Sequence, residues 1–195
     1  MAGQDHSTLK AATLLFVYFA AMAAGMVDLA LSAGYFVSSG TGALIGGLLA
    51  LVAGLAFLAW SLWGLHRNSL VFPRLVLPAL AAAAAIHVAV LAVGLTAPAR
   101  SLDISHLAAL GVTLMALAGA GWLRRQHQTN GGGTHGQPRT GRLLAAAFGA
   151  AVVVASVATP GLAASMAGQH AVPHGEHGQA PSEGVNPALT PGHHH

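Results

Sequence analysis

Histidines near the C-terminus are the residues of this chain whose type and spacing most directly suggest chemistry. The chain has 195 residues and 12 histidines, and its last part is rich in glycine and proline. The histidines of this tail are His170, His174, His177, His193, His194 and His195. Imidazole is a good ligand for Zn, Cu(II) and Ni(II). The tail therefore predicts a site for Cu, Ni or Zn, to which Glu176 could add an oxygen ligand.

The sequence around these histidines leaves other interpretations open. Glycine and proline beside them keep any helix or strand from presenting the rings, so binding must order the tail at a cost of about 1–2 kcal/mol per fixed residue. We therefore expect a modest affinity. The tail could instead be a solubilising spacer, and His193–His195 could be the remnant of an affinity tag.

A second group of ionisable residues lies inside apolar stretches: Asp28, His87 and His106, with Asp103 nearby. Ionisable residues are costly in lipid and by default indicate function. Asp28 and His87 each share a helix face with alanine and glycine, which predicts that both point into a helix bundle. We expect an intramembrane polar site that passes on or senses the ion. The alternative is that Asp28 and His87 form a structural link.

The composition predicts the fold class before any motif is considered. Apolar residues make up 54% of the chain, charged residues 7%, and the mean hydropathy is +0.64. A soluble domain carries about 25% charged residues, so we expect an all-α, polytopic membrane helix bundle. Cysteine is absent, which excludes disulfides and thiolate metal sites. The basic residues are scattered singly, which argues against a nucleic-acid partner.

Five apolar stretches are long enough to cross about 30 Å of hydrocarbon. They cover residues 11–34, 42–65, 73–97, 102–123 and 141–164. We expect residues 1–9 to form a cytoplasmic N-terminus, 10–125 a four-span bundle, 126–140 a flexible cytoplasmic linker and 165–195 a disordered extracytoplasmic tail. The fifth stretch could instead be an internal signal-like segment that is cleaved after Ala163 or Ala164.

The cations predict the orientation of this five-span protein. With the N-terminus in the cytoplasm, Arg100 falls outside, and the other cations fall inside: Lys10, Arg67, Arg74, Arg124, Arg125, Arg139 and Arg142. This distribution follows the positive-inside rule. The expected partner is the lipid bilayer. Gly42 and Gly46 have the spacing of a close helix contact, which favours packing within the chain, with a homo-oligomer or a membrane-protein partner as the alternative.

Taken together, these patterns favour a cell-membrane protein that binds or handles a divalent transition metal at the outer face. A ligand-free scaffold or assembly protein is the alternative, and a b-haem redox subunit ligated by His87 and His106 is another. Counting 1.5 Å per residue places His87 about 13 Å and His106 about 6 Å below the outer boundary, which argues against haem. No catalytic motif is present: His174-Gly175-Glu176-His177 has the wrong order for a zinc protease, so we do not expect an enzyme.

Overall fold

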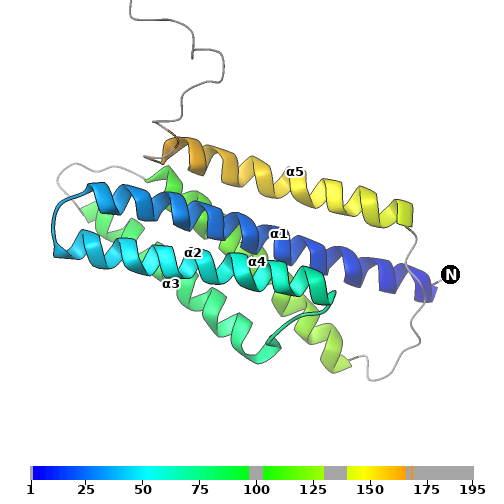
Figure 1. The fold of residues 1–195 in the computed structure, drawn as a ribbon. Coiled ribbons are helices and arrows are strands. Elements are labelled where there is room, and N and C mark those ends of the chain that lie inside the picture. The colour runs from blue at the N-terminus through cyan, green and yellow to red at the C-terminus, as the bar shows by residue number, and fades with distance from the viewer. Residues whose placement is uncertain (1, 97–102, 130–139, 166–167, 169–195) are drawn as a thin grey trace, which may run out of the picture.

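The computed structural model is all-helical in the residues that it describes, which are 2–96, 103–129, 140–165 and 168 (Figure 1). Each helix is long and apolar enough to cross a membrane, so the predicted membrane helix bundle is confirmed. The helices are α1 (Ala2–Val37), α2 (Thr41–Arg67), α3 (Pro73–Thr96), α4 (Ile104–Thr129) and α5 (Thr140–Ala164). Helix α1 begins well before the apolar stretch that starts at residue 11.

Consecutive helices run in opposite directions, so the bundle has two ends of different chemistry (Figure 1). At one end α1, α3 and α5 begin and α2 and α4 finish. This end, named the arginine end, carries these described cations: Lys10, Arg67, Arg74, Arg124, Arg125 and Arg142. The opposite end is named the histidine end, because the half of the bundle next to it contains Asp28, His87, Asp103 and His106.

Helix α1 is the central element of the bundle. It packs against α2, α4 and α5, whereas α3 packs mainly against α4. Its buried side chains include Val17, Tyr18, Ala21, Ala24 and Val27. A helix that is apolar nearly all round is expected to be surrounded by protein or lipid, and the small size of these alanines lets the neighbouring helices approach closely.

The closest approach of α1 and α2 occurs at Gly25 and Gly54. A Cβ atom on Gly25 would lie 2.7 Å from the Gly54 carbonyl oxygen, and one on Gly54 would lie 2.8 Å from the Gly25 carbonyl oxygen. Small residues thus serve packing within the chain at this crossing. Gly42, which the spacing analysis paired with Gly46, has open space where a Cβ would be. Gly46 does pack within the chain, because a Cβ there would lie 3.4 Å from the Tyr35 ring of α1, so one of the two paired glycines faces α1 and the other does not.

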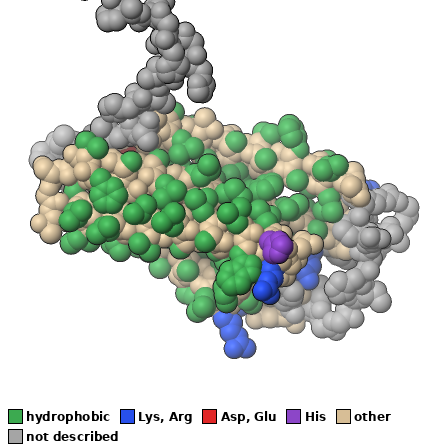
Figure 2. Space-filling view, viewed as in Figure 1, with side chains coloured by type: hydrophobic (Ala, Val, Ile, Leu, Met, Phe, Trp, Pro, Cys, Tyr) green, Lys and Arg blue, Asp and Glu red, His purple; other side chains and the backbone are tan. Residues whose placement is uncertain are grey.

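The surface between the two ends is apolar. Figure 2 shows hydrophobic side chains spread along the bundle and Lys and Arg side chains gathered near the arginine end. Large apolar side chains such as Leu49, Val52 and Val93 are more than 60% exposed. An apolar surface of this extent suits contact with lipid and not with water.

Candidate intramembrane site

Three helices each contribute one buried ionisable side chain to the same part of the bundle. Asp28 on α1, His87 on α3 and His106 on α4 are 3%, 5% and 4% exposed. The burial of Asp28 and His87 agrees with the prediction that the small-residue faces carrying them point into the bundle. Because α1 does not pack along α3, the Asp28–His87 contact joins two helices that are otherwise held together through α4.

The three side chains form a continuous line of polar contacts. Asp28 Oδ1 lies 3.5 Å from His87 Nε2. His87 Nδ1 in turn lies 3.2 Å from His106 Nδ1, and the two rings are tilted at 55° with their centroids 5.4 Å apart. The sequence analysis considered a contact between Asp28 and His87, and the fold adds His106 to that pair.

Asp103 lies next to His106, at the end of the line of contacts that is opposite Asp28. Its Oδ1 accepts hydrogen bonds from the backbone N–H groups of Ser105 (2.9 Å) and His106 (3.3 Å), so Asp103 is the N-cap of α4. Its Oδ2 lies 3.8 Å from His106 Nε2, and its side chain is half exposed. Asp103 therefore both starts α4 and faces the His106 ring.

Tyr35 is a member of the cluster that the sequence analysis did not select. Its hydroxyl lies 3.0 Å from His106 Nε2. Tyr35 follows Asp28 by two helical turns, so both side chains lie on the same face of α1. That spacing was the available signal, but a tyrosine near the end of an apolar stretch is equally typical of a ring at the membrane interface.

The expectation that His87 and His106 lie at different depths is wrong, because their Nδ1 atoms are 3.2 Å apart. His106 lies in the first turn of α4, whereas α3 continues for more than two turns beyond His87, to Thr96. The two helices are therefore staggered along the bundle, and counting residues from each apolar boundary does not give a common depth.

A hydrogen bond to α5 fixes the first turn of α4, in addition to the cap that Asp103 provides. The Ser105 hydroxyl donates a hydrogen bond to the Gly161 carbonyl oxygen at 2.9 Å. A Cβ atom on Gly161 would collide with the Ala108 side chain, so the glycine allows α5 to approach α4 at this point. The residue that precedes His106 is thus anchored, which fixes where the His106 ring lies.

The contacts at the outer sides of the two rings determine what can lie between them. His87 Nε2 faces the Asp28 carboxylate, and His106 Nε2 faces the Tyr35 hydroxyl and the Asp103 carboxylate. A carboxylate next to one ring nitrogen favours the tautomer with its proton on that nitrogen. The two Nδ1 atoms lie 3.2 Å apart, and the tautomers decide which of them donates a proton to the other. When the Tyr35 hydroxyl donates to His106 Nε2, His106 Nδ1–H can donate to His87 Nδ1; when neither Nδ1 carries a proton, the two nitrogens face each other as a pair of metal ligands.

The histidine tail gives no geometry to compare with this cluster. His170, His174, His177 and His193–His195 lie outside the described residues. Among the described residues, no group of three or more His, Cys, Asp or Glu side chains is arranged to hold a metal ion. The cluster thus offers two facing imidazole nitrogens, supported on their far sides, rather than a complete coordination sphere.

Comparison with known proteins adds no assignment to this geometry: no family model, no curated protein and no solved structure matches the chain.

Proposed function

We propose that this membrane protein binds a divalent transition metal, Cu, Ni or Zn, at the outer face, and that the His87–His106 pair is its intramembrane site. The observation that supports this most directly is the 3.2 Å separation of the two Nδ1 atoms. Two imidazole ligands of a tetrahedral ion, each about 2.0–2.1 Å from the metal, have nitrogens about 3.3 Å apart. The rings are therefore already at the separation that a shared ion requires.

The groups behind the two rings support the same proposal. Metal-ligating histidines usually donate their other ring N–H to a carboxylate or another acceptor, which fixes the tautomer and orients the ring. Asp28 occupies this position behind His87, and Tyr35 and Asp103 occupy it behind His106. Asp28, when ionised, also balances part of the charge of an ion in a low-dielectric environment.

Two protein ligands do not complete a coordination sphere, so the remaining positions must be filled from elsewhere. In this proposal water fills them, or imidazoles of the tail that captures the ion first. Asp103 is half exposed and Asp28 is almost completely buried. An ion would therefore enter past Asp103 and stop between the two rings, with Asp28 beyond them.

Metal binding by the purified, full-length protein tests this proposal. Equilibrium dialysis against Cu(II), Ni(II) or Zn(II), followed by metal analysis, gives the stoichiometry and the affinity. We expect the double variant His87→Ala/His106→Ala to lose one bound ion with the tail intact. His66→Ala, at the arginine end, is the matched control and should bind as the unaltered protein does. Unchanged stoichiometry in the double variant would overturn the intramembrane site.

The tail is tested separately in the same assay. Replacing His170, His174 and His177 together with Ala should remove the ions that the tail captures and leave the one between the rings. Binding to both places should weaken as the pH falls, because a protonated imidazole has no lone pair for the metal. If removing His193–His195 alone eliminates all binding, the metal proposal fails and those residues act as a tag-like end.

Proton transfer is a second candidate function, favoured by the linear order of the cluster. Tyr35, His106, His87 and Asp28 follow one another as proton-accepting and proton-donating groups, and chains of this kind form proton relays in membrane proteins. A proton on one of the two facing Nδ1 atoms would form the hydrogen bond that links the two histidines in this chain. If dialysis finds no metal, proton flux into liposomes that contain the protein should be lost in His87→Ala and His106→Ala but not in His66→Ala. Unchanged flux would leave the ligand-free scaffold.

The orientation that places the cluster near the outer face follows from the positive-inside rule. We infer that the arginine end and the N-terminus face the cytoplasm and that residues 165–195 lie outside. The chain has no cysteine, so single cysteines at Ser39, Gln128 and Ala180 can be labelled in intact cells with an impermeant thiol reagent. Ser39→Cys and Ala180→Cys should be labelled and Gln128→Cys should be protected. The opposite pattern would reverse the orientation.

A further inference from the structure

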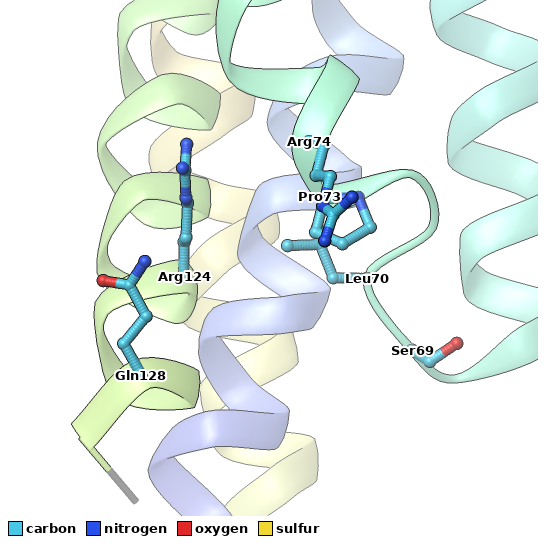
Figure 3. A pocket seen from close by; sticks show the side chains of 6 residues that line it. All are labelled: Ser69, Leu70, Pro73, Arg74, Arg124 and Gln128. Atoms are coloured by element: carbon cyan, nitrogen blue, oxygen red, sulfur yellow. The ribbon is translucent and has the colours of Figure 1, made fainter.

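The arginine end contains a pocket that the metal proposal does not use. It has a volume of about 520 Å³ and lies between the start of α3 and the last turns of α4 (Figure 3). Its lining residues are Ser69, Leu70, Pro73, Arg74, Arg124 and Gln128. Two of these six residues are arginines and none is acidic. Figure 3 shows the two arginines on neighbouring helices, with Gln128 one turn after Arg124 on α4.

The surroundings of Arg74 point to an anion. Arg74 is the second residue of α3, where the helix dipole is positive and a cation is unfavourable by about 0.3–1 kcal/mol. The ion pairs Asp28–His87 and Asp103–His106 both lie in the other half of the bundle. A negatively charged ligand beside Arg74 would pair with the guanidinium and offset its unfavourable position at the positive end of the helix dipole.

The surface beside the pocket is apolar and faces the lipid. Phe72 and Leu75, which flank Pro73 and Arg74, are 52% and 65% exposed. Trp60 and Trp63 lie near the same end of α2, where aromatic rings typically mark the level of the lipid headgroups. A ligand at this position would therefore place its charge in the pocket and any hydrocarbon chain on the apolar surface.

We propose that this pocket binds the phosphate headgroup of an anionic phospholipid. Guanidinium groups bind phosphate through paired N–H donors, and an amide such as Gln128 adds a further donor. Basic pockets between transmembrane helices are suited to anionic headgroups. The acyl chains would run along Phe72 and Leu75. A soluble phosphate compound shares the headgroup chemistry but has no chain to occupy that surface.

Lipid retention by the full-length protein tests this proposal. Native mass spectrometry of the detergent-solubilised protein, titrated with phosphatidylglycerol or phosphatidylcholine, gives the affinity for each lipid. We expect clear preference for phosphatidylglycerol and about fivefold weaker binding in Arg74→Gln and in Arg124→Gln, as for the loss of one cation near an anionic surface. Arg67→Gln is the matched control, because Arg67 lies at the same end but stacks on Trp63 and does not line the pocket. Its binding should change less than twofold.

Several results would overturn the lipid site. One is equal binding of the two lipids, and another is an equal loss in Arg67→Gln, which would indicate general surface charge. A third is inorganic phosphate competing at the same concentration as phosphatidylglycerol, which would indicate a soluble ligand. If the glutamine variants fail to fold, the salt dependence of the unaltered protein decides: retention should fall steeply between 50 and 500 mM NaCl as charges are screened, and unchanged retention would refute the proposal.

Discussion

The two halves of the bundle both bury polar groups, but they satisfy them in different ways. Near the arginine end, the Tyr18 hydroxyl donates to the Ser69 carbonyl oxygen (2.7 Å) and accepts from the Val71 N–H (3.1 Å). Trp60 Nε1 donates to the Val71 carbonyl oxygen (3.1 Å). Each of these side chains is neutral and bonds to the backbone of the α2–α3 loop. Near the histidine end, ionisable side chains contact one another.

This difference distinguishes the hydrogen bonds of Tyr18 and Trp60, which stabilise the fold, from the His87–His106 contact, which is a candidate site. A loop at a membrane surface leaves backbone groups unpaired, and burying them costs several kcal/mol each in lipid. Tyr18 and Trp60 remove that cost, so their role is fully explained by the fold. The His87–His106 contact pairs no backbone group, and its two facing Nδ1 atoms can share a proton or ligate an ion.

The largest effect on stability is expected at Gly64, beneath the Tyr18 ring. A Cβ atom on Gly64 would coincide with that ring, which is completely buried. Gly64→Ala should therefore destabilise the protein by about 1–3 kcal/mol, as other overpacking substitutions do, and should loosen the α2–α3 loop. Unfolding in detergent, followed by circular dichroism, measures the loss.

Gly42→Ala is the matched control for that experiment. Gly42 lies on the same helix with open space where a Cβ would be, so its substitution should be neutral or stabilising by up to about 1 kcal/mol. Equal losses in the two variants would show that helix geometry rather than the Tyr18 contact sets the effect. Metal binding at the histidine end should be unchanged in both variants.

The next effect is expected from Tyr18→Phe, which keeps the ring and removes its hydroxyl. The change leaves the Ser69 carbonyl and the Val71 N–H without this partner, which should cost about 1–2 kcal/mol. Protease cleavage within residues 68–72 should become faster, because the loop is released. Phe16→Leu, a change on the same helix that affects no hydrogen bond, is the comparison. A silent Tyr18→Phe would contradict the structural role.

Sequence reasoning predicted the fold well because each helix carries its own signal. Five apolar stretches with Pro73 at a helix start and Arg67 near a helix end are local features. The helix limits agree within a few residues except at the start of α1 and at the end of α4, which continues to Thr129 through the first residues of the predicted linker. The stagger of α3 and α4 depends instead on how the helices pack, and no local pattern encodes it. For that reason the sequence indicated Asp28, His87 and His106 as candidate residues. It did not predict that His87 contacts His106 or that Tyr35 contacts His106.

A smaller effect is expected from Ser105→Ala, next to the cluster. This change removes the hydrogen bond to the Gly161 carbonyl oxygen, and such bonds in membrane proteins contribute about 0.6 kcal/mol on average. Ser156→Ala is the control, because that exposed serine bonds within its own helix to Val153. If Ser105 positions the first turn of α4, the variant should also weaken metal binding, whereas Ser156→Ala should not. Loss of stability with unchanged binding would confine Ser105 to packing.

The smallest effect on stability, and the most informative one, is expected from Asp28→Asn. The amide has nearly the same shape and keeps an oxygen that can accept from His87 Nε2, so the cost should be below about 0.6 kcal/mol. The amide cannot carry the negative charge that orients His87 and balances an ion. Loss of such a supporting group typically weakens metal affinity by 10–100-fold. Asp28→Asn should therefore leave the unfolding transition in place and shift the metal-binding isotherm by about that factor.

The same logic distinguishes this outcome from a purely structural link between α1 and α3. If Asp28 served to hold the two helices together, Asp28→Asn would move stability and binding in parallel, and Asp28→Leu would be more disruptive than Asn in both. If it supports the His87–His106 pair, Asn and Leu should weaken binding similarly while differing in stability. Parallel changes in the two measurements would place the cluster with Tyr18 among the structural contacts and leave the protein without an intramembrane site.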